Sequence, residues 1–374
     1  MSSMRMIVDA LASASEPVVL ATVVRITGSS YGGVGARMVI RTDGSTIGIV
    51  SGGCLESDLA EHALQAGRSH APRIVTYDTR ADDDAAWGLG LGCNGLIDVL
   101  LEPLEIDEAK AFAALLSRAL DAPARSVLAT VIASEGPPAV GAHALFVDGE
   151  IETAGDWSAG LLALVGADTR DAFGEARRGL VREYEGVSVA FEVVAPSIRL
   201  VICGSGPDVV PLVQFGVQLG WDLTVIDHRP VQDAHAERFP GARAAECGEP
   251  SELESAITID EHTAAVVMSH NYARDLDYVR ALLHSRAAYI GVLGPRARTE
   301  RMLADIAAAG ERVERGDRIY SPVGLDVGGD GPDFIAMAII AEVSATIHAR
   351  GGGHLRDRRG SLHPSPAHEA AEQT

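Results

Sequence analysis

The sequence predicts an α/β fold in which an N-terminal α/β domain with an internal duplication precedes a C-terminal Rossmann-like parallel-sheet domain. Two observations lead to this fold class. Short apolar runs alternate with helical patterns from residue 199 to residue 347, which is typical of a parallel sheet with right-handed crossovers. Several short motifs also recur in the same order within the N-terminal half, which indicates a duplicated unit. We place the domains at residues 1–195 and 196–348 and expect residues 349–374 to form a disordered tail.

The N-terminal half begins with a helical pattern and then reads as strands separated by glycine loops. We expect helices at residues 4–14 and 55–66, and strands at residues 18–25, 37–41, 46–50 and 96–101. A glycine loop at residues 28–33 follows the first strand, and a Thr-Asp-Gly-Ser turn at residues 42–45 closes a hairpin.

The repeat is visible in matching motifs. Val-Leu-Ala-Thr-Val stands at residues 19–23 and again at 127–131. Val-Gly-Ala follows at residues 34–36 and 140–142, and an Asp-Gly turn ends both copies, at Asp43-Gly44 and at Asp148-Gly149. Where the first copy continues to Gly-Gly-Cys at residues 52–54, the second reads Gly-Asp-Trp at 155–157. We therefore expect the first copy to carry the functional residues and the second copy to have a structural role.

The C-terminal domain opens with a strand and a tight glycine turn. We expect strands at residues 199–203, 223–226, 264–268 and 289–293, and a helix at residues 273–285. Gly204-Ser205-Gly206 after the first strand is the start of a dinucleotide fingerprint, and Asp227 ends the second strand, where an acid can bind a ribose hydroxyl. Val209 stands in place of the third glycine, so bound NAD(P) and an empty scaffold both remain open.

Composition excludes several classes of function. The chain has 374 residues and a net charge of −21, and so acidic a surface argues against binding to nucleic acid or anionic lipid. No apolar run reaches the length of a membrane span, and residues 1–17 lack the apolar core of a signal peptide. Its four cysteines form no Cys-x-x-Cys pair, which argues against a structural zinc site. We expect a cytoplasmic protein with reduced thiols.

Two glycine–cysteine loops are the sharpest candidate sites. Cys54 lies in a Gly-Gly-Cys turn before an expected helix, where the helix dipole favours the thiolate. Cys93 lies in a second glycine-rich loop at residues 88–95. Buried, inert cysteine is the commoner alternative, and it suits Cys203 and Cys247 better.

Two further loops follow C-terminal strands, at the edge of the sheet where ligands of parallel-sheet proteins bind. His270 lies in a Ser-His-Asn-Tyr loop, where a structural hydrogen bond is the alternative to a ligand contact. Arg296 and Arg298 begin an expected helix after Gly294, an arrangement that suits an anion such as phosphate, and solvated helix charges are the alternative.

At these residues the chain resembles the XdhC/CoxI family of accessory proteins for the maturation of xanthine dehydrogenase and carbon monoxide dehydrogenase. The resemblance is carried in both halves by motifs at residues 28–30, 35–36, 43–44, 52–56, 92–93, 204–206, 227–229, 269–270, 289–291 and 322–326. Asn94 and Asn271 depart from the Cys-Gly-Gly and Thr-His-Asp patterns usual in the family.

The resemblance implies binding of the molybdenum cofactor (molybdopterin), help with its sulfuration, and its insertion into a molybdenum hydroxylase of the xanthine dehydrogenase type. It also implies a cysteine desulfurase as sulfur donor. Cys54 would be the principal thiol, with a possible persulfide role, and Cys93 the second, both in contact with molybdenum. The expected cofactor-binding residues are Gly52, Gly53, Cys54, Glu56, Cys93, Gly204, Gly206, Asp208, Asp227, Arg229, His270 and Arg296.

Three hypotheses follow. The first is a maturation factor, a chaperone for the cofactor rather than a catalyst. The second is an NAD(P)-dependent oxidoreductase that uses the Rossmann-like domain. The third is a non-catalytic docking scaffold, which should tolerate loss of both loop thiols. A homodimer is compatible with the duplicated unit and the acidic surface.

Overall fold

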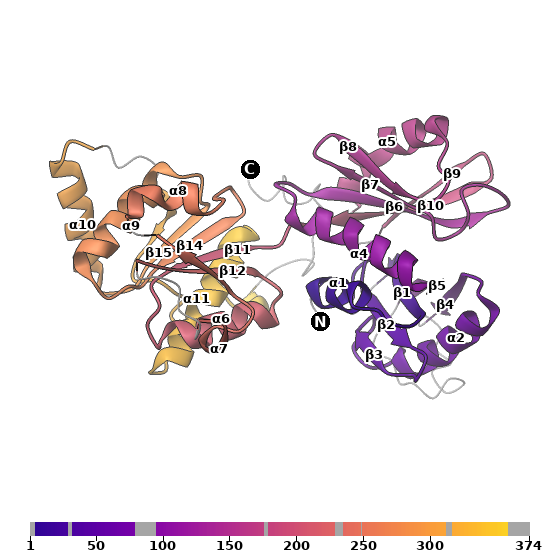
Figure 1. Ribbon diagram of the computed structural model, residues 1–374, viewed down its shortest axis with the longest axis horizontal. Coiled ribbons are helices and arrows are strands. Elements are labelled where there is room, and N and C mark those ends of the chain that lie inside the picture. Colours follow the sequence, from indigo (N-terminus) through magenta and orange to yellow (C-terminus); the bar gives the residue numbers. More distant parts are fainter. Residues whose placement is uncertain are drawn as a thin grey trace. The chain divides into compact units, whose positions relative to one another are not determined.

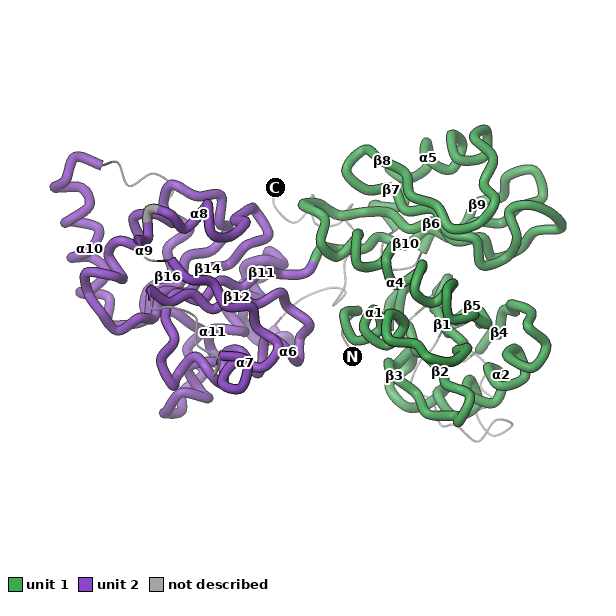
Figure 2. The backbone as a smooth tube through the Cα atoms, in the orientation of Figure 1, with its two compact units in different colours: residues 1–196, 360–374 green, residues 197–359 purple. Residues whose placement is uncertain are grey.

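Two copies of one pattern of strands and helices build the first unit of the chain, within residues 1–196 (Figure 2). The computed structural model describes residues 4–28, 32–78, 95–175, 179–228, 235–247, 249–311 and 316–357. The first copy consists of α1 (Met4–Ala12), β1 (Val18–Gly28), β2 (Arg37–Arg41), β3 (Thr46–Gly48), α2 (Glu56–Ser69), β4 (Arg73–Asp78) and β5 (Gly95–Leu104). The second consists of α4 (Ile106–Asp121), β6 (Ser126–Ser134), β7 (His143–Val147), β8 (Glu150–Ala154), α5 (Ala159–Gly174), β9 (Leu180–Tyr184) and β10 (Val187–Val194).

Both copies form antiparallel sheets of the same topology. The strand orders are β3-β2-β1-β5-β4 and β8-β7-β6-β10-β9, so each strand of one copy has a counterpart at the same place in the other. The register agrees as well: Leu20 of β1 lies opposite Glu102, and its repeat partner Leu128 of β6 lies opposite Glu192. The duplication predicted from the sequence motifs is therefore confirmed at the level of strand pairing.

The hairpin turns of the two copies confirm the Asp-Gly prediction. Gly44 has a φ of 84°, and Asp148 and Gly149 have φ values of 52° and 80°. The turn of the second copy is a two-residue hairpin, in which positive φ matches the twist of the flanking strands, and Asp and Gly adopt it at little cost. The turn of the first copy is longer, and there only Gly44 has positive φ.

The core of this unit lies in three layers. Helices α1 and α4 lie between the two sheets (Figure 1), where Leu11 and Phe112 pack in one cluster with Leu20 of β1 and Leu128 of β6. Helix α2 covers the other face of the first sheet and α5 the other face of the second. Because β1 is covered on both faces, its run of β-branched and aliphatic residues is buried almost throughout.

The second unit, within residues 197–359, is a six-stranded sheet in which every described pair is parallel. Its strands are β11 (Arg199–Cys203), β12 (Asp222–Asp227), β13 (Arg243–Glu246), β14 (Thr263–Val267), β15 (Tyr289–Val292) and β16 (Ile319–Tyr320), in the order β13-β12-β11-β14-β15-β16. This is the strand order of dinucleotide-binding folds, and it confirms the predicted Rossmann-like domain.

Helices cover both faces of the parallel sheet. The helices are α6 (Val209–Gln218), α7 (His235–Arg238), α8 (Leu253–Ala256), α9 (Tyr272–His284), α10 (Arg296–Ala308) and α11 (Pro332–Ile347), with short 3₁₀ turns η1 (Pro250–Glu252), η2 (Gly316–Arg318) and η3 (Leu355–Asp357). Helices α6 and α11 belong to one apolar cluster of the sheet, and α9 and α10 belong to the other.

Two further predictions concern the chain as a whole. Of the tail expected to be disordered, residues 349–357 are described and contain η3, and residues 358–374 lie outside the described residues. Within the described ranges no helix has the length and apolar character needed to cross a bilayer.

Candidate functional site

The loop that carries Cys54 joins β3 to α2 and is open on its outer side. Gly52 and Gly53 have φ values of 88° and 109°, a region that favours glycine. A Cβ atom placed on Gly53 would meet nothing within 4 Å. The Cys54 side chain is exposed, whereas the next residue, Leu55, is buried in the core under α2. The thiol therefore stands on the surface of a loop anchored by its neighbour.

The carboxylate of Glu56 holds this loop in shape. It accepts hydrogen bonds from the backbone N–H groups of Val50 (3.1 Å), Ser51 (2.8 Å), Gly53 (2.9 Å) and Leu55 (3.1 Å), and from the Ser51 hydroxyl (2.7 Å). The Ser51 oxygen in turn accepts a bond from the Leu55 N–H. The Glu56 carboxylate thus accepts hydrogen bonds from the backbone N–H groups that surround it at the start of α2.

This arrangement fixes the charge of Glu56. Burial alone would raise the pKa of its carboxyl, but the hydrogen bonds from Ser51 and the neighbouring backbone outweigh burial and lower the pKa. A carboxylate already satisfied by its own loop is a poor ligand for a cofactor. Glu56, predicted as a cofactor-binding residue, therefore has the geometry of a residue that positions the Cys54 loop.

The other thiols differ from Cys54. Cys203 ends β11 and Cys247 follows β13, and burial raises the pKa of both. Their predicted burial is confirmed, and both are suited to packing. Cys93 lies outside the described residues. Among the residues that the structure describes, no group of three or more His, Cys, Asp and Glu side chains could enclose a metal ion.

In the second unit, predicted residues gather where the strand order reverses, between β11 and β14. Gly204 has a φ of 134°, and a Cβ there would lie 2.7 Å from the carbonyl oxygen of Met268. Only glycine lets the two chain segments approach so closely. The hydroxyl of Ser205 donates a hydrogen bond to the carboxylate of Asp227, so the predicted ribose acceptor already has an internal partner.

Asp208 and His270 meet across the same edge of the sheet. His270 Nε2 lies 2.8 Å from one oxygen of Asp208, which precedes α6, and His270 has a φ of 60°. The other Asp208 oxygen is covered and lacks a hydrogen-bond partner. It also lies so close to Gly206 that any Cβ there would overlap it. The carboxylate of Asp208 therefore occupies the mouth of the glycine turn.

Of the two arginines at the start of α10, Arg298 forms an ion pair. Its guanidinium donates to the fully buried carboxylate of Asp275 at 2.6 Å, and Asp275 also accepts hydrogen bonds from the hydroxyl and backbone N–H of Ser269. Arg296 is exposed at the first residue of the helix. Arg229 lies outside the described residues.

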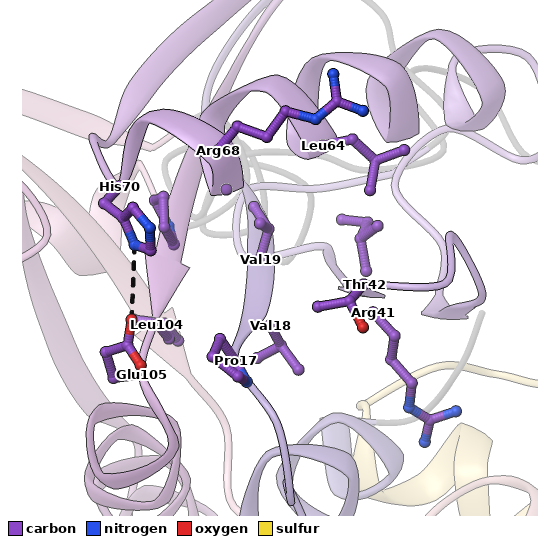
Figure 3. A pocket seen from close by; sticks show the side chains of 13 residues that line it. Pro17, Val18, Val19, Arg41, Thr42, Leu64, Arg68, His70, Leu104 and Glu105 are labelled. Carbon is purple, nitrogen blue, oxygen red and sulfur yellow. Dashed lines mark ion pairs between the residues drawn. The ribbon is translucent and has the colours of Figure 1, made fainter.

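A separate cavity of about 360 Å³ lies beside the C-terminal end of α2, lined by residues of β1, β2, α2 and β5. Figure 3 shows Arg41 and Arg68 on opposite sides of this cavity and His70 facing Glu105, 3.6 Å away. None of the predicted site residues lines it.

The structure thus brings the predicted residues together in two groups, one in each unit. Gly52, Gly53, Cys54 and Glu56 form the loop before α2, and Gly204, Gly206, Asp208, Asp227 and His270 meet at the edge of the parallel sheet. Ser51, which shares the loop hydrogen bonds with Glu56, was missed at the level of sequence. The pairing of Asp275 with Arg298 was missed too, although their places after neighbouring strands were a usable signal.

Fold and site define a two-unit α/β protein with an exposed loop thiol in a duplicated antiparallel unit and a Rossmann-type second unit. The chain belongs to the XdhC and CoxI family. Residues 11–78 match the XdhC and CoxI family and residues 200–343 match the XdhC Rossmann domain.

Similar proteins cover nearly the whole chain. It is 31% identical over 347 residues to a probable xanthine dehydrogenase subunit of Bacillus subtilis, with 92% of this chain and 98% of that protein covered. It is 25% identical to the "Molybdenum cofactor insertion chaperone PaoD" of Escherichia coli, with 91% and 87% covered. A crystal structure described as a xanthine dehydrogenase from Bacillus halodurans matches with a TM-score of 0.73 and 30% identity, over 97% of this chain and 98% of that one.

Proposed function

We propose that this chain is an accessory protein that binds the molybdenum cofactor and assists its sulfuration and its insertion into a molybdenum hydroxylase of the xanthine dehydrogenase type. Family membership supports this proposal, because one relative is named as a probable component of xanthine dehydrogenase and another as a molybdenum cofactor insertion chaperone. In this proposal the cofactor is cargo, bound reversibly and passed on.

The observation that carries the proposal is the exposed thiol of Cys54 on a loop of fixed shape. Soft thiolate sulfur is a good ligand for molybdenum and a good acceptor in persulfide chemistry. The hydrogen bonds to Glu56 fix the loop backbone before any ligand arrives, so little ordering of the loop opposes binding.

A carrier also needs to release its cargo. Among the described residues Cys54 is part of no group of side chains that could enclose a metal. A thiolate that adds to the ligands the cofactor already holds gives an attachment that ligand exchange can reverse. Multidentate protein ligation would oppose transfer to a client.

The residues of the second unit are less suited to binding NAD(P) than its strand order suggests. The Asp208 carboxylate stands where a pyrophosphate would approach the glycine turn, and like charges repel there. Asp227 is already bonded to Ser205. We therefore rank the oxidoreductase hypothesis below the cofactor carrier. A cysteine desulfurase as sulfur donor and a homodimer stay predictions of the sequence.

The test is an anaerobic titration of the full chain with purified molybdenum cofactor, in which calorimetry measures binding. We expect saturable binding that Cys54→Ala weakens by about tenfold or more, since a metal–ligand bond is lost. Cys247→Ala, which removes a buried thiol of the second unit, is the matched control and should bind as the wild type does. Saturable binding of NAD(P)H with no binding of the molybdenum cofactor would overturn the proposal.

A further inference from the structure

The duplicated unit contains two buried carboxylates at equivalent positions. Glu102 of β5 and Glu192 of β10 lie opposite the equivalent residues Leu20 and Leu128. Each carboxylate reaches the other copy of the repeat. The Glu192 side chain lies against Gly35, and an oxygen of Glu102 would be 3.1 Å from a Cβ on the equivalent Gly141.

One of these carboxylates has its hydrogen-bond donors within the protein. Arg37 of β2 extends its guanidinium to Glu192, with Nη1 2.8 Å from Oε1 and Nη2 2.5 Å from Oε2. The Arg37 side chain is 1% exposed and that of Glu192 is 10% exposed. Two parallel N–H donors in one plane therefore satisfy both oxygens of this carboxylate.

At the position equivalent to Arg37 the second copy has His143. Arg37 lies opposite Thr22, and His143 lies opposite the repeat partner Thr130. The imidazole is shorter than an arginine side chain, and its Nδ1 is 3.0 Å from the Thr130 hydroxyl. Its Nε2 lies 3.1 Å from Glu102 Oε1, but without the alignment of a hydrogen bond.

Within the described part of the chain, Glu102 is consequently a buried carboxylate that has the His143 contact but accepts no hydrogen bond. Its side chain is 3% exposed, and neither of its oxygens has a hydrogen-bond partner among the described residues. Buried polar atoms are nearly always hydrogen-bonded in folded proteins, and burying a carboxylate without hydrogen bonds is unfavourable. With the His143 contact on Oε1 and no hydrogen bond to either oxygen, this carboxylate can accept donors from outside the chain.

Space for a ligand lies directly beside this carboxylate. Glu102 and His143 line a cavity of about 900 Å³, and residues 134–137 and 139–142 form part of its wall. The remaining lining includes further acidic side chains, Glu105, Glu108, Glu135 and Asp156. An acidic cavity with a buried carboxylate favours a ligand that is cationic or rich in N–H donors.

We propose that this cavity binds a planar ligand with two adjacent N–H donors, which pair with Glu102 as the guanidinium of Arg37 pairs with Glu192. Two sources offer that edge: a guanidinium group, as in arginine, and a 2-amino-4-oxopyrimidine ring, as in guanine and pterins. The proposal rests on the repeat and does not depend on Cys54 or on the proposed function.

The test uses ligand-observed NMR and calorimetry on the full chain. The probes are arginine and guanidinium chloride for one source, and guanosine and 6-carboxypterin for the other. Tetramethylammonium keeps the positive charge but has no N–H donor, and it should not bind. Saturable binding of a probe from either pair supports the proposal and identifies the source.

Two variants address the site from opposite directions. Glu102→Gln removes the charge and should weaken binding by about tenfold or more. His143→Arg supplies an internal guanidinium, as in the other copy, and should exclude the ligand while the chain stays folded. Glu175→Gln, which removes an exposed charge that does not line the cavity, is the control and should bind normally. Failure of all four probes to bind the wild type, or undiminished binding in Glu102→Gln, would overturn the proposal.

Discussion

Arg37 and Glu192 join the two copies of the repeat through a buried pair of parallel hydrogen bonds, 155 positions apart in the sequence. Removing one member of such a pair leaves an uncompensated buried charge. We expect Arg37→Met to destabilise the first unit by about 3–5 kcal/mol. Urea unfolding, followed by hydrogen exchange of peptides from the first unit, measures the change.

The double variant Arg37→Met/Glu192→Gln separates the pair from general packing. It removes both charges, so it should recover a large part of the stability lost in Arg37→Met. If the double variant is as unstable as the sum of the two single variants, the pair does not act as a unit.

The loop that carries Cys54 should loosen when Glu56 loses its charge. Glu56→Gln replaces one acceptor oxygen by an amide that faces N–H groups, so the loop loses hydrogen bonds. We expect hydrogen exchange at residues 50–55 to speed up on the order of tenfold. Glu61→Gln, an exposed position on the same helix, is the control. Equal exchange in wild type and Glu56→Gln would contradict the role assigned to Glu56.

The same carboxylate predicts a dependence on pH. Because the pKa of Glu56 is lowered from 4.5 in the folded chain, the folded state favours the carboxylate. Its contribution to stability is therefore fully present above pH 4.5 and is lost as the pH falls through the lowered value. The difference in unfolding free energy between wild type and Glu56→Gln should be constant near neutral pH and shrink below pH 4.5. A difference that widens on acidification would refute this.

Gly204→Ala tests the close approach at the edge of the parallel sheet. The added Cβ would meet backbone atoms of Met268 and Ser269, which cannot rotate away, and the φ of 134° disfavours any side chain. We expect the second unit to lose about 2–4 kcal/mol. Gly351→Ala, where a Cβ meets nothing within 4 Å, should change little in the same unfolding experiment. Comparable stability of the two variants would be evidence against the tight turn.

Much of the fold follows from local pattern. Strand–helix alternation predicts the parallel sheet because buried strands are short and apolar and their crossover helices are amphipathic. The motifs around residues 19–23 and 127–131 predict the duplication because both copies fill the same central strand position. The cross-copy partners of Arg37 and His143 are not local, since they depend on how the two sheets pack.

The candidate site is less fully predictable. Glycines and a cysteine before a helix are enough to identify the Cys54 loop. The sequence around Glu56, by contrast, indicates a first-turn acid and a cofactor ligand, and only the fold reveals that its carboxylate turns back to the loop N–H groups. Asp208 is expected among the cofactor-binding residues, and its packing against Gly206 is visible only in the fold.

The central claim is that Cys54 holds the molybdenum cofactor. Its most direct test is the molybdenum and pterin content of the full chain, purified without oxygen from cells that make the cofactor. We predict both in a fixed ratio to wild-type protein and a loss of most of each in Cys54→Ala, with Cys247→Ala unchanged. Equal molybdenum and pterin in wild type and Cys54→Ala would contradict the claim.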